Sequence, residues 1–399
     1  MDPIPIAVTN PLLTASDEAV HRMTLETTKA QGLANEAFTS TEFLSLELEY
    51  LFSRTWVFAG VLSDVPNQGD IKPITVAGRE LFMVTNYEGI TKVFFNVCPH
   101  RGARLVVDDK NNSKVLTCPY HAWSFTLDGK LRGRPHFHGP NNHDKSSTND
   151  IYLFEVRSAT WNDWVFVNLD GQAPEFDSYM ESLMRRNVDW KLDSFHLGHY
   201  QSYEFHCNWK LAVENYFDNY HVFKIHPQLI EMQNMSDNTG MTIDGYHMFN
   251  YPTIAGEGRG LTVDPNGPTL PDVEGISSKI AKQMRYCTLF PNSAINMFTS
   301  NVEFLMFEPV SVNETIMHMW FYFSEEAATS DFYSRGREAV VADWTALNAE
   351  DSGICERLQF GRSCDAYDGG RFSTYWDTGT LHFHRQIAEA IRGLGKFSR

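Results

Sequence analysis

The stretch CPHRGARLVVDDKNNSKVLTCPYH (98–121) contains two short pairs of metal-binding side chains. Cys98 and His100 form the first pair, and Cys118 and His121 form the second. Each pair includes a proline, which fixes part of the backbone and removes a hydrogen-bond donor. Each pair therefore places one thiolate and one imidazole on a tight turn. The sequence predicts a metal site that is built from two loops.

Two kinds of metal site use two cysteines and two histidines. A zinc ion can be bound by this set, but zinc fingers usually combine a C-x-x-C pair with a separate histidine pair. Alternating Cys/His pairs suit a two-iron, two-sulfur cluster in which cysteines bind one iron and histidines bind the other. The spacing favours the cluster, with a zinc site or unrelated core residues as the alternatives.

The segment ENYFDNYHVFKIHP (214–227) holds a second set of candidate ligands. Asp218 and His221 are three residues apart, so on a helix they would share a face. His226 stands just before a proline, where the chain can bend back. Two imidazoles and one carboxylate form the facial ligand set of Fe(II), which leaves positions open for O₂ and substrate. Taken alone the pattern is weak, because surface or capping histidines produce the same spacing.

The composition excludes several classes of protein. The chain has 399 residues, 42% of them hydrophobic, which is enough for a large core in one or two domains. A formal net charge of −17 argues against nucleic acid, which binds basic surfaces. No signal peptide or membrane span is evident, and six cysteines are too few for a disulfide scaffold. We therefore expect a cytoplasmic protein with reduced thiols.

The first half of the chain has the pattern of an antiparallel β domain. Short β-rich runs alternate with turn residues from Trp56 to about Asp170. Asp128 and Gly129 are typical of a hairpin turn. Both Cys/His pairs lie inside this predicted domain. The expected strands include 71–78, 81–85 and 91–97.

The second half mixes helices and strands after a linker at 171–174. Asn208 is a suitable cap for a helix over 211–223, and Thr39 and Glu42 form a capping signal near the N-terminus. The Gly- and Pro-rich segment 255–275 is either a substrate lid or a plain surface loop. The expected helices are 39–53, 176–186, 211–223, 331–358 and 380–394, and the expected strands are 199–209, 302–310 and 315–324.

The two loops resemble the Rieske family. CPHRGARL (98–105) and CPYHAWSFTLDGKL (118–131) match the form found in Rieske oxygenases, with C-x-H followed by C-x-x-H. The resemblance implies a [2Fe-2S] cluster. Cys98 and Cys118 would bind one iron, and His100 and His121 would bind the other.

NWKLAVENYFDNYHVFKIHP (208–227) resembles the iron-binding segment of Rieske non-heme iron oxygenase α subunits. The resemblance implies that His221 and His226 bind the mononuclear Fe(II). It also implies that Asp218 is no ligand but a bridge between His221 and His121 of the partner subunit.

The family's third iron ligand is an aspartate far downstream. AEDSGICERLQ (349–359) is similar to the segment that carries it, which nominates Asp351, with Glu350 and Glu356 as competing candidates. Glu214 and Asn215 correspond to family positions near the iron and the electron-transfer bridge, although ordinary polar helix residues are the alternative. Four further histidines are expected to be structural: His206, His318, His382 and His384.

The resemblance extends from about Trp56 to the C-terminus and implies an α+β fold. A Rieske antiparallel β domain (56–170) would be joined to a helix-grip catalytic domain (171–399), to which an N-terminal helical segment (1–55) also belongs. Electrons would come from NAD(P)H through a separate reductase, sometimes with a ferredoxin. Head-to-tail packing around a threefold axis, giving a homotrimer, would bring the two metal centres together across subunits.

The substrate is less constrained. GRFSTYWDTGTLHFHRQIAEAI (370–391) is similar to the branch that oxidises choline, betaines and carnitine, although carnitine oxygenases carry glutamate at the position of Asp218. A cation would suit an aromatic cage. Aromatic acids or hydrocarbons, a Rieske electron carrier without catalysis and a structural zinc protein are the alternatives. The residues considered for a cage, which are equally compatible with a core, are Phe298, Phe304, Phe307, Trp320 and Tyr322.

Overall fold

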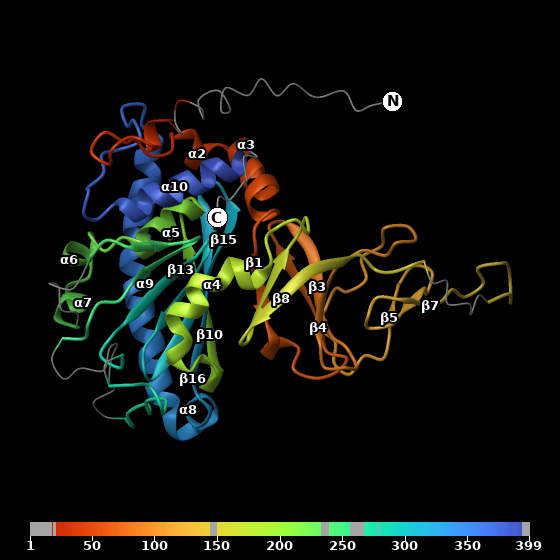
Figure 1. Cartoon of the computed structure of the whole chain (residues 1–399). Helices are drawn as coiled ribbons and strands as arrows, with labels where there is room; N and C mark the ends of the chain where they lie inside the picture. Colours follow the sequence, from red (N-terminus) through yellow and green to blue (C-terminus); the bar gives the residue numbers. More distant parts are fainter. Residues whose placement is uncertain are drawn as a thin grey trace. The chain divides into compact units, whose positions relative to one another are not determined.

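The computed structural model divides the chain into two compact units. Met1–Leu51 and Asp177–Arg399 form the first unit, and Phe52–Phe176 form the second (Figure 1). Most of the predicted lid, residues 256–266, lies outside the described part of the chain. The structure describes residues 18, 21–143, 150–232, 239–255, 267–278 and 280–392.

The second unit consists of antiparallel sheets, as the sequence predicts. A six-stranded sheet has the order β1-β9-β8-β4-β3-β2, and a three-stranded sheet has the order β5-β6-β7. The predicted hairpin is present, since Gly129 has φ 82° and the Thr126 N–H donates to the Lys130 carbonyl (2.8 Å). The strands are Val57–Val61 (β1), Ile71–Val76 (β2), Arg79–Thr85 (β3), Thr91–Phe95 (β4), Leu116–Thr117 (β5), Ser124–Phe125 (β6), Leu131–Gly133 (β7), Glu155–Trp161 (β8) and Trp164–Asn168 (β9).

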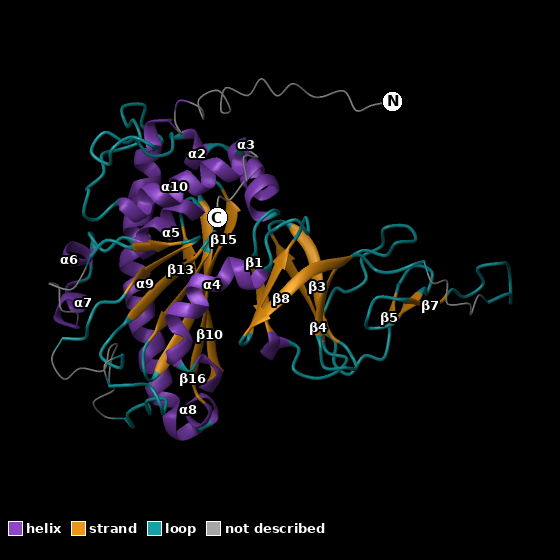
Figure 2. Cartoon of the chain, viewed as in Figure 1, coloured by secondary structure: helices purple, strands orange, loops and turns teal. Residues whose placement is uncertain are grey.

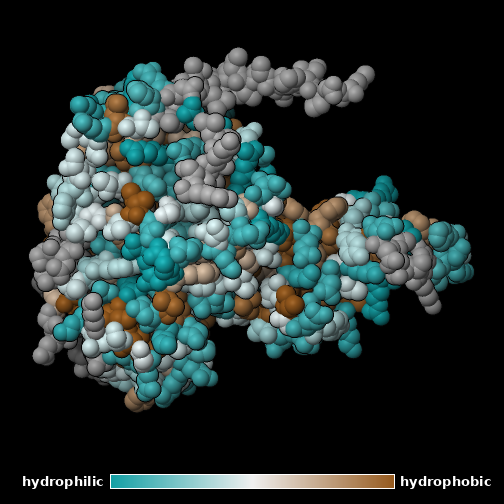
Figure 3. Space-filling model, in the orientation of Figure 1, coloured by the Kyte–Doolittle hydropathy of each residue, from teal (hydrophilic) through white to brown (hydrophobic). Residues whose placement is uncertain are grey.

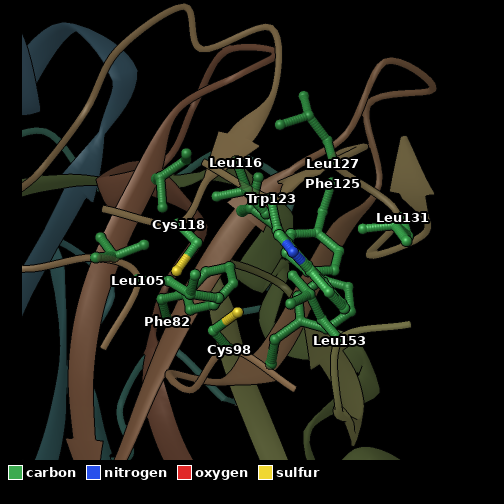
Figure 4. Packing of buried hydrophobic residues seen from close by; sticks show 14 residues of the cluster. Phe82, Cys98, Leu105, Leu116, Cys118, Trp123, Phe125, Leu127, Leu131 and Leu153 are labelled. Carbon is green, nitrogen blue, oxygen red and sulfur yellow. The ribbon is translucent and has the colours of Figure 1, made fainter. Parts of the chain in front are cut away.

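Cys98 and Cys118 lie in two loops with the same hydrogen-bond pattern. In each loop the cysteine N–H donates to the carbonyl five residues on (2.8 Å), and the cysteine carbonyl accepts from the N–H four residues on (3.0 Å). That fourth residue has a positive φ in both loops, 75° at Gly102 and 55° at Ala122. Both cysteines are buried in the hydrophobic core of the unit (Figure 4).

The first unit contains a seven-stranded antiparallel sheet with the order β10-β16-β15-β14-β13-β12-β11 (Figure 2). The predicted strands at 302–310 and 315–324 are confirmed as its β15 and β16. The predicted strand at 199–209 is placed too late, because the chain leaves the sheet at Phe205 and turns into a capped helix. The strands are Phe195–Phe205 (β10), Thr242–Asp244 (β11), His247–Asn250 (β12), Arg285–Leu289 (β13), Ser293–Met297 (β14), Asn301–Ser311 (β15) and Glu314–Ser324 (β16).

Helices α5 and α9 pack against each other and against this sheet. The α-helices of the first unit are Glu36–Thr39 (α2), Thr41–Leu46 (α3), Phe176–Asn187 (α4), Trp209–Phe217 (α5), Val222–Ile225 (α6), Pro227–Met232 (α7), Glu325–Thr329 (α8), Ser334–Arg362 (α9) and Thr378–Ile391 (α10). A π-helix follows α3 at Glu47–Phe52, and short 3₁₀ turns occur at Leu62–Asp64, Val188–Trp190, Leu192–Ser194 and Asp331–Tyr333.

A buried ion pair attaches the N-terminal segment to α5. Lys210 Nζ lies 2.7 Å from Glu47 Oε1, and both side chains are fully buried. The Trp209 indole N–H donates to the other oxygen of the same carboxylate (2.9 Å). Burying two charges is tolerated only when each finds such partners, so this pair fixes the start of α5.

Two helix predictions are wrong in detail. The helix expected over 211–223 ends at Phe217, because the Asp218 carboxylate accepts from the Tyr220 N–H (2.7 Å) and competes with the helical pattern. The predicted cap at Thr39 is displaced by one residue. Ser40 is the cap of α3, and its hydroxyl accepts from the Phe43 N–H (3.1 Å).

Among the described residues, no helix is both long and apolar enough to cross a membrane. On the face of the molecule shown in Figure 3, hydrophilic residues predominate and hydrophobic residues form small separate patches. This distribution agrees with the acidic composition of the chain.

We expect Gly102→Ala to lower the free energy of unfolding by about 1 kcal/mol, because a Cβ disfavours the left-handed conformation. No atom lies within 4 Å of the added Cβ, so the effect comes from the backbone alone. Urea denaturation of the purified protein measures it. Ala122→Gly, at the equivalent position of the other loop, is the matched control and lacks this penalty. Unchanged stability of Gly102→Ala would contradict the left-handed backbone conformation of residue 102.

Candidate metal centres

Three potential ligand atoms converge in the first unit. The Nε2 atoms of His221 and His226 lie 3.2 Å apart. Asp351 Oδ1 lies 3.4 Å from the first and 2.9 Å from the second. His221 precedes α6, His226 follows it, and Asp351 comes from α9. These are the only three residues in the described part of the chain whose ligand atoms form such a group.

Carboxylates hold both imidazoles in the orientation that a metal ion requires. His221 Nδ1 lies 3.2 Å from Asp218 Oδ2, and His226 Nδ1 lies 2.7 Å from Glu350 Oε2. An ionised carboxylate only accepts hydrogen bonds, so each Nδ1 carries the proton. The Nε2 lone pairs are then free to face Asp351, which is the arrangement of a two-histidine, one-carboxylate iron site.

The electrostatics of this group favour a positive charge between the three side chains. Burial alone would lower the pKa of His221, but hydrogen bonds with Asp218 and Asp351 outweigh it and raise the pKa to about 9. Burial would raise the pKa of Asp351, but the two histidines lower it overall. The residues therefore fit a cationic metal.

Asp218 and His221 meet by a different route from the one predicted. They do not lie on one face of a helix, because Asp218 has extended backbone angles (φ −75°, ψ 111°) and His221 precedes the next helix. A turn brings the two side chains together instead. The side chain of Asp218 is 29% exposed.

Glu214 and Asn215 point to different places, as neighbours on a helix must. The Asn215 amide donates to Asp351 Oδ1 (3.2 Å), beside the three ligand atoms. Glu214 instead accepts from His384 Nε2 (2.7 Å) and lies 3.7 Å from Arg362, and its role near the iron stays a prediction. His384 also accepts from the Leu33 N–H (3.1 Å), so this histidine is structural.

The competing carboxylates on α9 do not join the three ligand atoms. Glu350 instead lies behind His226, on the Nδ1 side of the ring. Glu356 is exposed to solvent. Sequence reasoning missed the orienting role of Glu350, because the contact joins positions 124 residues apart and no local pattern encodes it.

A pocket adjoins these atoms between α5, α9 and the sheet. Of the five residues considered for an aromatic cage, only Phe307 lines it. Side chains alternate along a strand, so Phe304, Trp320 and Tyr322 face the opposite side of the sheet. No lysine or arginine is among the described lining residues, which are Phe205, Ala212, Asn215, Tyr216, Asp218, Asn219, His221, Val222, His226, Leu229, Tyr286, Leu305, Phe307, Met317, Trp344, Leu347, Asn348 and Asp351.

The second unit holds the other candidate centre. The rings of His100 and His121 lie 4.6 Å apart, and His100 stacks on Trp123 at 4.4 Å. The Nδ1 atoms of both histidines are buried and have no hydrogen-bond partner among the described residues. Buried polar atoms are normally paired, so two such atoms in neighbouring rings fit the role of metal ligands.

The two cysteines complete this second set. Both are reduced and buried. Burial and the neighbouring thiol of Cys118 raise the pKa of Cys98, although the backbone N–H groups of His100 and Arg101 oppose the shift. Two thiols and two unpaired imidazole nitrogens therefore lie in adjacent loops, and this set fits a cluster with one cysteine-bound and one histidine-bound iron.

Both units match known families. Residues 55–145 match the Rieske [2Fe-2S] domain, and residues 192–393 match the catalytic domain of the ring hydroxylating alpha subunit. The chain belongs to the ring-hydroxylating oxygenase alpha subunits. This alpha subunit is an oxidoreductase that incorporates O₂ and uses a Rieske cluster and a mononuclear iron. The alternatives of an electron carrier without catalysis and of a structural zinc protein are thereby removed.

Curated relatives of this alpha subunit include both monooxygenase and dioxygenase subunits. A carnitine monooxygenase oxygenase subunit of Acinetobacter pittii is 27% identical over 350 residues (84% of this chain, 87% of that protein). A glycine betaine monooxygenase oxygenase subunit of Pseudomonas aeruginosa is 22% identical over 397 residues (92% and 91%). An anthranilate 1,2-dioxygenase large subunit of Acinetobacter baylyi is 34% identical over 203 residues (49% and 42%).

Solved structures share the fold of this alpha subunit. Naphthalene 1,2-dioxygenase from Rhodococcus sp. superimposes with a TM-score of 0.77 at 17% identity, covering 97% of this chain and 100% of that one. A quaternary ammonium Rieske monooxygenase, studied for carnitine oxidation and inter-subunit electron transfer, superimposes with a TM-score of 0.72 at 21% identity (93% and 96%). The α+β fold class predicted from the sequence is confirmed.

We expect Glu350→Ala to weaken binding of the mononuclear iron by about 10- to 100-fold, because His226 loses the partner that fixes its ring. Iron content after dialysis against a graded chelator series measures the effect, and the Rieske absorbance reports an intact cluster. Glu356→Ala removes an exposed carboxylate from the same helix and serves as the control. Equal iron retention in both variants would show that Glu350 does not orient His226.

Proposed function

We propose that this alpha subunit is the terminal oxygenase of a system that oxidises a quaternary ammonium compound. The observation that carries the proposal is the charge of the pocket. Two carboxylates, Asp218 and Asp351, line it together with the two histidines and several aromatic side chains, and no lysine or arginine is among the described lining residues. Relatives that act on carnitine and glycine betaine align with most of the chain and support the same substrate class.

The aromatic lining suits a cation physically. Tyr216, Tyr286, Phe307 and Trp344 present rings to the pocket, and an aromatic face attracts an ammonium group. The carboxylate of an aromatic acid, like that of a betaine, would find no lysine or arginine among the described lining residues, so the pocket is suited to the ammonium group rather than to an acid group. Within the cationic class, the aspartate at position 218 argues against carnitine, because the family resemblance places glutamate there in carnitine oxygenases.

An uncharged aromatic compound is the second candidate substrate. Apolar side chains such as Leu305, Phe307 and Met317 form part of the pocket, and a hydrocarbon ring packs well on them. The match to an anthranilate dioxygenase large subunit over 49% of the chain supports an aromatic substrate, although anthranilate itself is an aromatic acid. The two candidates differ in charge, which makes them separable by experiment.

We assign the metal ligands as follows. Cys98 and Cys118 bind one iron of the Rieske cluster, and His100 and His121 bind the other. The mononuclear iron is bound by the three convergent side chains, His221, His226 and Asp351. When bound, the cluster relays single electrons and the mononuclear iron activates O₂. The Rieske domain corresponds to 56–170, and the catalytic domain comprises 1–55 and 171–399.

Asn215, Glu350 and Asp218 orient the side chains that bind the mononuclear iron. Asn215 donates to Asp351 Oδ1 and thereby restrains this carboxylate. Glu350 holds His226 and Asp218 holds His221, each through the proton on Nδ1. The partly exposed Asp218 carboxylate is also suited to accept from His121 of the partner subunit, which would make it the bridge between the two centres.

This bridge requires an assembly and an electron donor. A head-to-tail homotrimer supplies the neighbouring Rieske centre, because heterologous contacts close into rings. The related quaternary ammonium monooxygenase studied for inter-subunit electron transfer supports this arrangement. Electrons enter from an NAD(P)H-dependent reductase, with or without a ferredoxin. Location in the cytoplasm stays a prediction.

We expect Asp218→Ala to retain both metals but to lose turnover by several orders of magnitude, since it removes the bridge and not a ligand. Asp351→Ala is expected instead to lose mononuclear iron while the Rieske electron paramagnetic resonance signal is unchanged. Metal analysis, that spectrum and single-turnover product formation measure these outcomes. Full activity of Asp218→Ala with normal iron content would refute the bridge.

The substrate class is tested with a panel of trimethylammonium compounds, aromatic acids and aromatic hydrocarbons, supplied with NADH and a reductase. We expect oxidised product, identified by mass spectrometry, from at least one trimethylammonium compound. Product measurement excludes uncoupled O₂ consumption as the explanation. Turnover of aromatic compounds alone would refute the proposed substrate class but not the oxygenase assignment.

A further inference from the structure

Glu303 is a buried carboxyl group without a cationic partner. It lies on β15 and is fully buried. Other buried carboxylates of the first unit are compensated, since Glu47 pairs with Lys210 and Glu214 contacts Arg362 and His384. No lysine, arginine or histidine forms an ion pair with Glu303 within the described ranges. A buried carboxylate without a positive partner is costly, so its presence calls for a function.

Glu303 faces the side of the sheet that carries the pocket. Side chains two residues apart on a strand lie on the same face, and Leu305 and Phe307 of β15 line the pocket. Asn296 is the cross-strand partner of Glu303 on β14. The hydroxyl of Tyr216, a pocket residue, donates to Asn296 Oδ1 (2.5 Å). The carboxyl group is thus linked to the pocket wall by one side chain.

The polar groups around Glu303 are incompletely paired. Oε1 accepts from the Asn301 amide, but Oε2 has no hydrogen-bond partner among the described residues. Asn296 Nδ2 and the indole Nε1 of Trp344 are likewise buried and unpaired. Trp344 lines the pocket, and its indole lies close enough to lower the pKa of Glu303 without forming a well-aligned hydrogen bond. Glu303 Oε2, Asn296 Nδ2 and Trp344 Nε1 thus form no well-aligned hydrogen bond, although both donors lie close enough to Glu303 to lower its pKa.

The position of Glu303 relative to the metal site suits a small substrate. Trp344, the neighbour of Glu303, precedes Asp351 by two turns of α9, which is about 10 Å along the helix axis. Asp351 and Trp344 both line the pocket, so the pocket extends from the metal-binding atoms to the residue that neighbours Glu303. The aromatic residues Tyr216 and Tyr286 lie along the same cavity.

We propose that Glu303 is a specificity-determining residue that supplies the negative charge for a quaternary ammonium group bound in the pocket. The inference rests on the proposed substrate class and names the residue that selects it. A cation that enters the pocket loses its water, and a carboxylate in the low-dielectric wall offsets this loss more strongly than a surface charge could.

The ionisation of Glu303 is consistent with this role. Burial raises its pKa to about 8, against the hydrogen-bonding groups of Asn301 and Trp344, which lower it. The empty pocket therefore keeps most of this group protonated at neutral pH, and the uncompensated charge is avoided. A positive charge nearby favours the ionised form of a carboxyl group, so binding of the cation would promote ionisation of Glu303.

The test uses the metal-loaded enzyme and matched pairs of ligands. Choline and its carbon isostere, in which a quaternary carbon replaces the nitrogen, have the same shape and differ in charge. Glycine betaine and tert-butylacetate form a second pair. Dissociation constants from calorimetry, and KM and kcat where turnover occurs, are compared for wild type, Glu303→Gln and Glu303→Asp.

We expect Glu303→Gln to weaken binding of the cationic member by about tenfold or more, as expected for loss of a close charge partner. Binding of the isostere should be unchanged or tighter, and Glu303→Asp should restore much of the preference for the cation. Glu308→Gln is the control, because it removes a carboxylate from the same strand on the opposite face, where Glu308 pairs with His318.

The other outcomes overturn the proposal in distinguishable ways. Unchanged cation binding in Glu303→Gln would refute the role of Glu303 while leaving the substrate class intact. Equal weakening for both members of a pair, with a lowered melting temperature, would show a structural role only. A fall in kcat for both members with unchanged affinity would indicate proton donation instead. Failure of wild type to bind or oxidise either cation would overturn this inference and the proposed substrate class together.

Discussion

One constraint governs the catalytic unit, namely that side chains from distant segments must meet at a single point. His226 Nε2 and Asp351 Oδ1 lie 2.9 Å apart although 125 residues separate them. Only the packing of α9 against α5 and the sheet makes this possible. The buried pair of Glu47 and Lys210 fixes the start of α5, and the Asn208 N–H donates to Gln359 on α9 (2.9 Å). The interior of the unit is therefore organised to bring these three ligand atoms together.

The same packing sets the charge of the pocket. Carboxylates lie behind both histidines, so the imidazole protons are held on Nδ1 and the Nε2 atoms remain free. The pocket beside them is lined by aromatic, acidic and histidine side chains, and the buried Glu303 lies on the same face of the sheet as the lining residues Leu305 and Phe307. An anionic, aromatic cavity beside a redox metal is suited to a small cation. In the proposed function, substrate preference follows from the side chains that surround the iron site rather than from the ligands themselves.

Predictions from local sequence pattern were confirmed where the residues of a short segment are sufficient to determine its conformation. The hairpin at Gly129 and the cap at Asn208 follow from residue chemistry within a few positions, and both are present. Predictions failed where a side-chain hydrogen bond replaced the helical backbone pattern. They also failed where the outcome depended on which face of the sheet a side chain occupies. Asp218 ends α5 by binding the Tyr220 N–H, which periodicity does not reveal. Three of the aromatic residues considered for a cage lie on the wrong face of the sheet, because their register depends on partner strands.

The sequence by itself determined the family, the α+β class and the residues of both candidate centres. It could do so because the two Cys/His pairs have a spacing typical of one kind of cluster, and because the segments 208–227 and 349–359 resemble those that carry the iron ligands in a known family. The tertiary structure alone decided that Glu350 contacts His226, that Glu214 contacts His384 and that Glu303 lies on the face of the sheet that carries the pocket. These contacts join positions far apart in the chain, so they depend on how helices and strands pack and leave no trace in any local pattern.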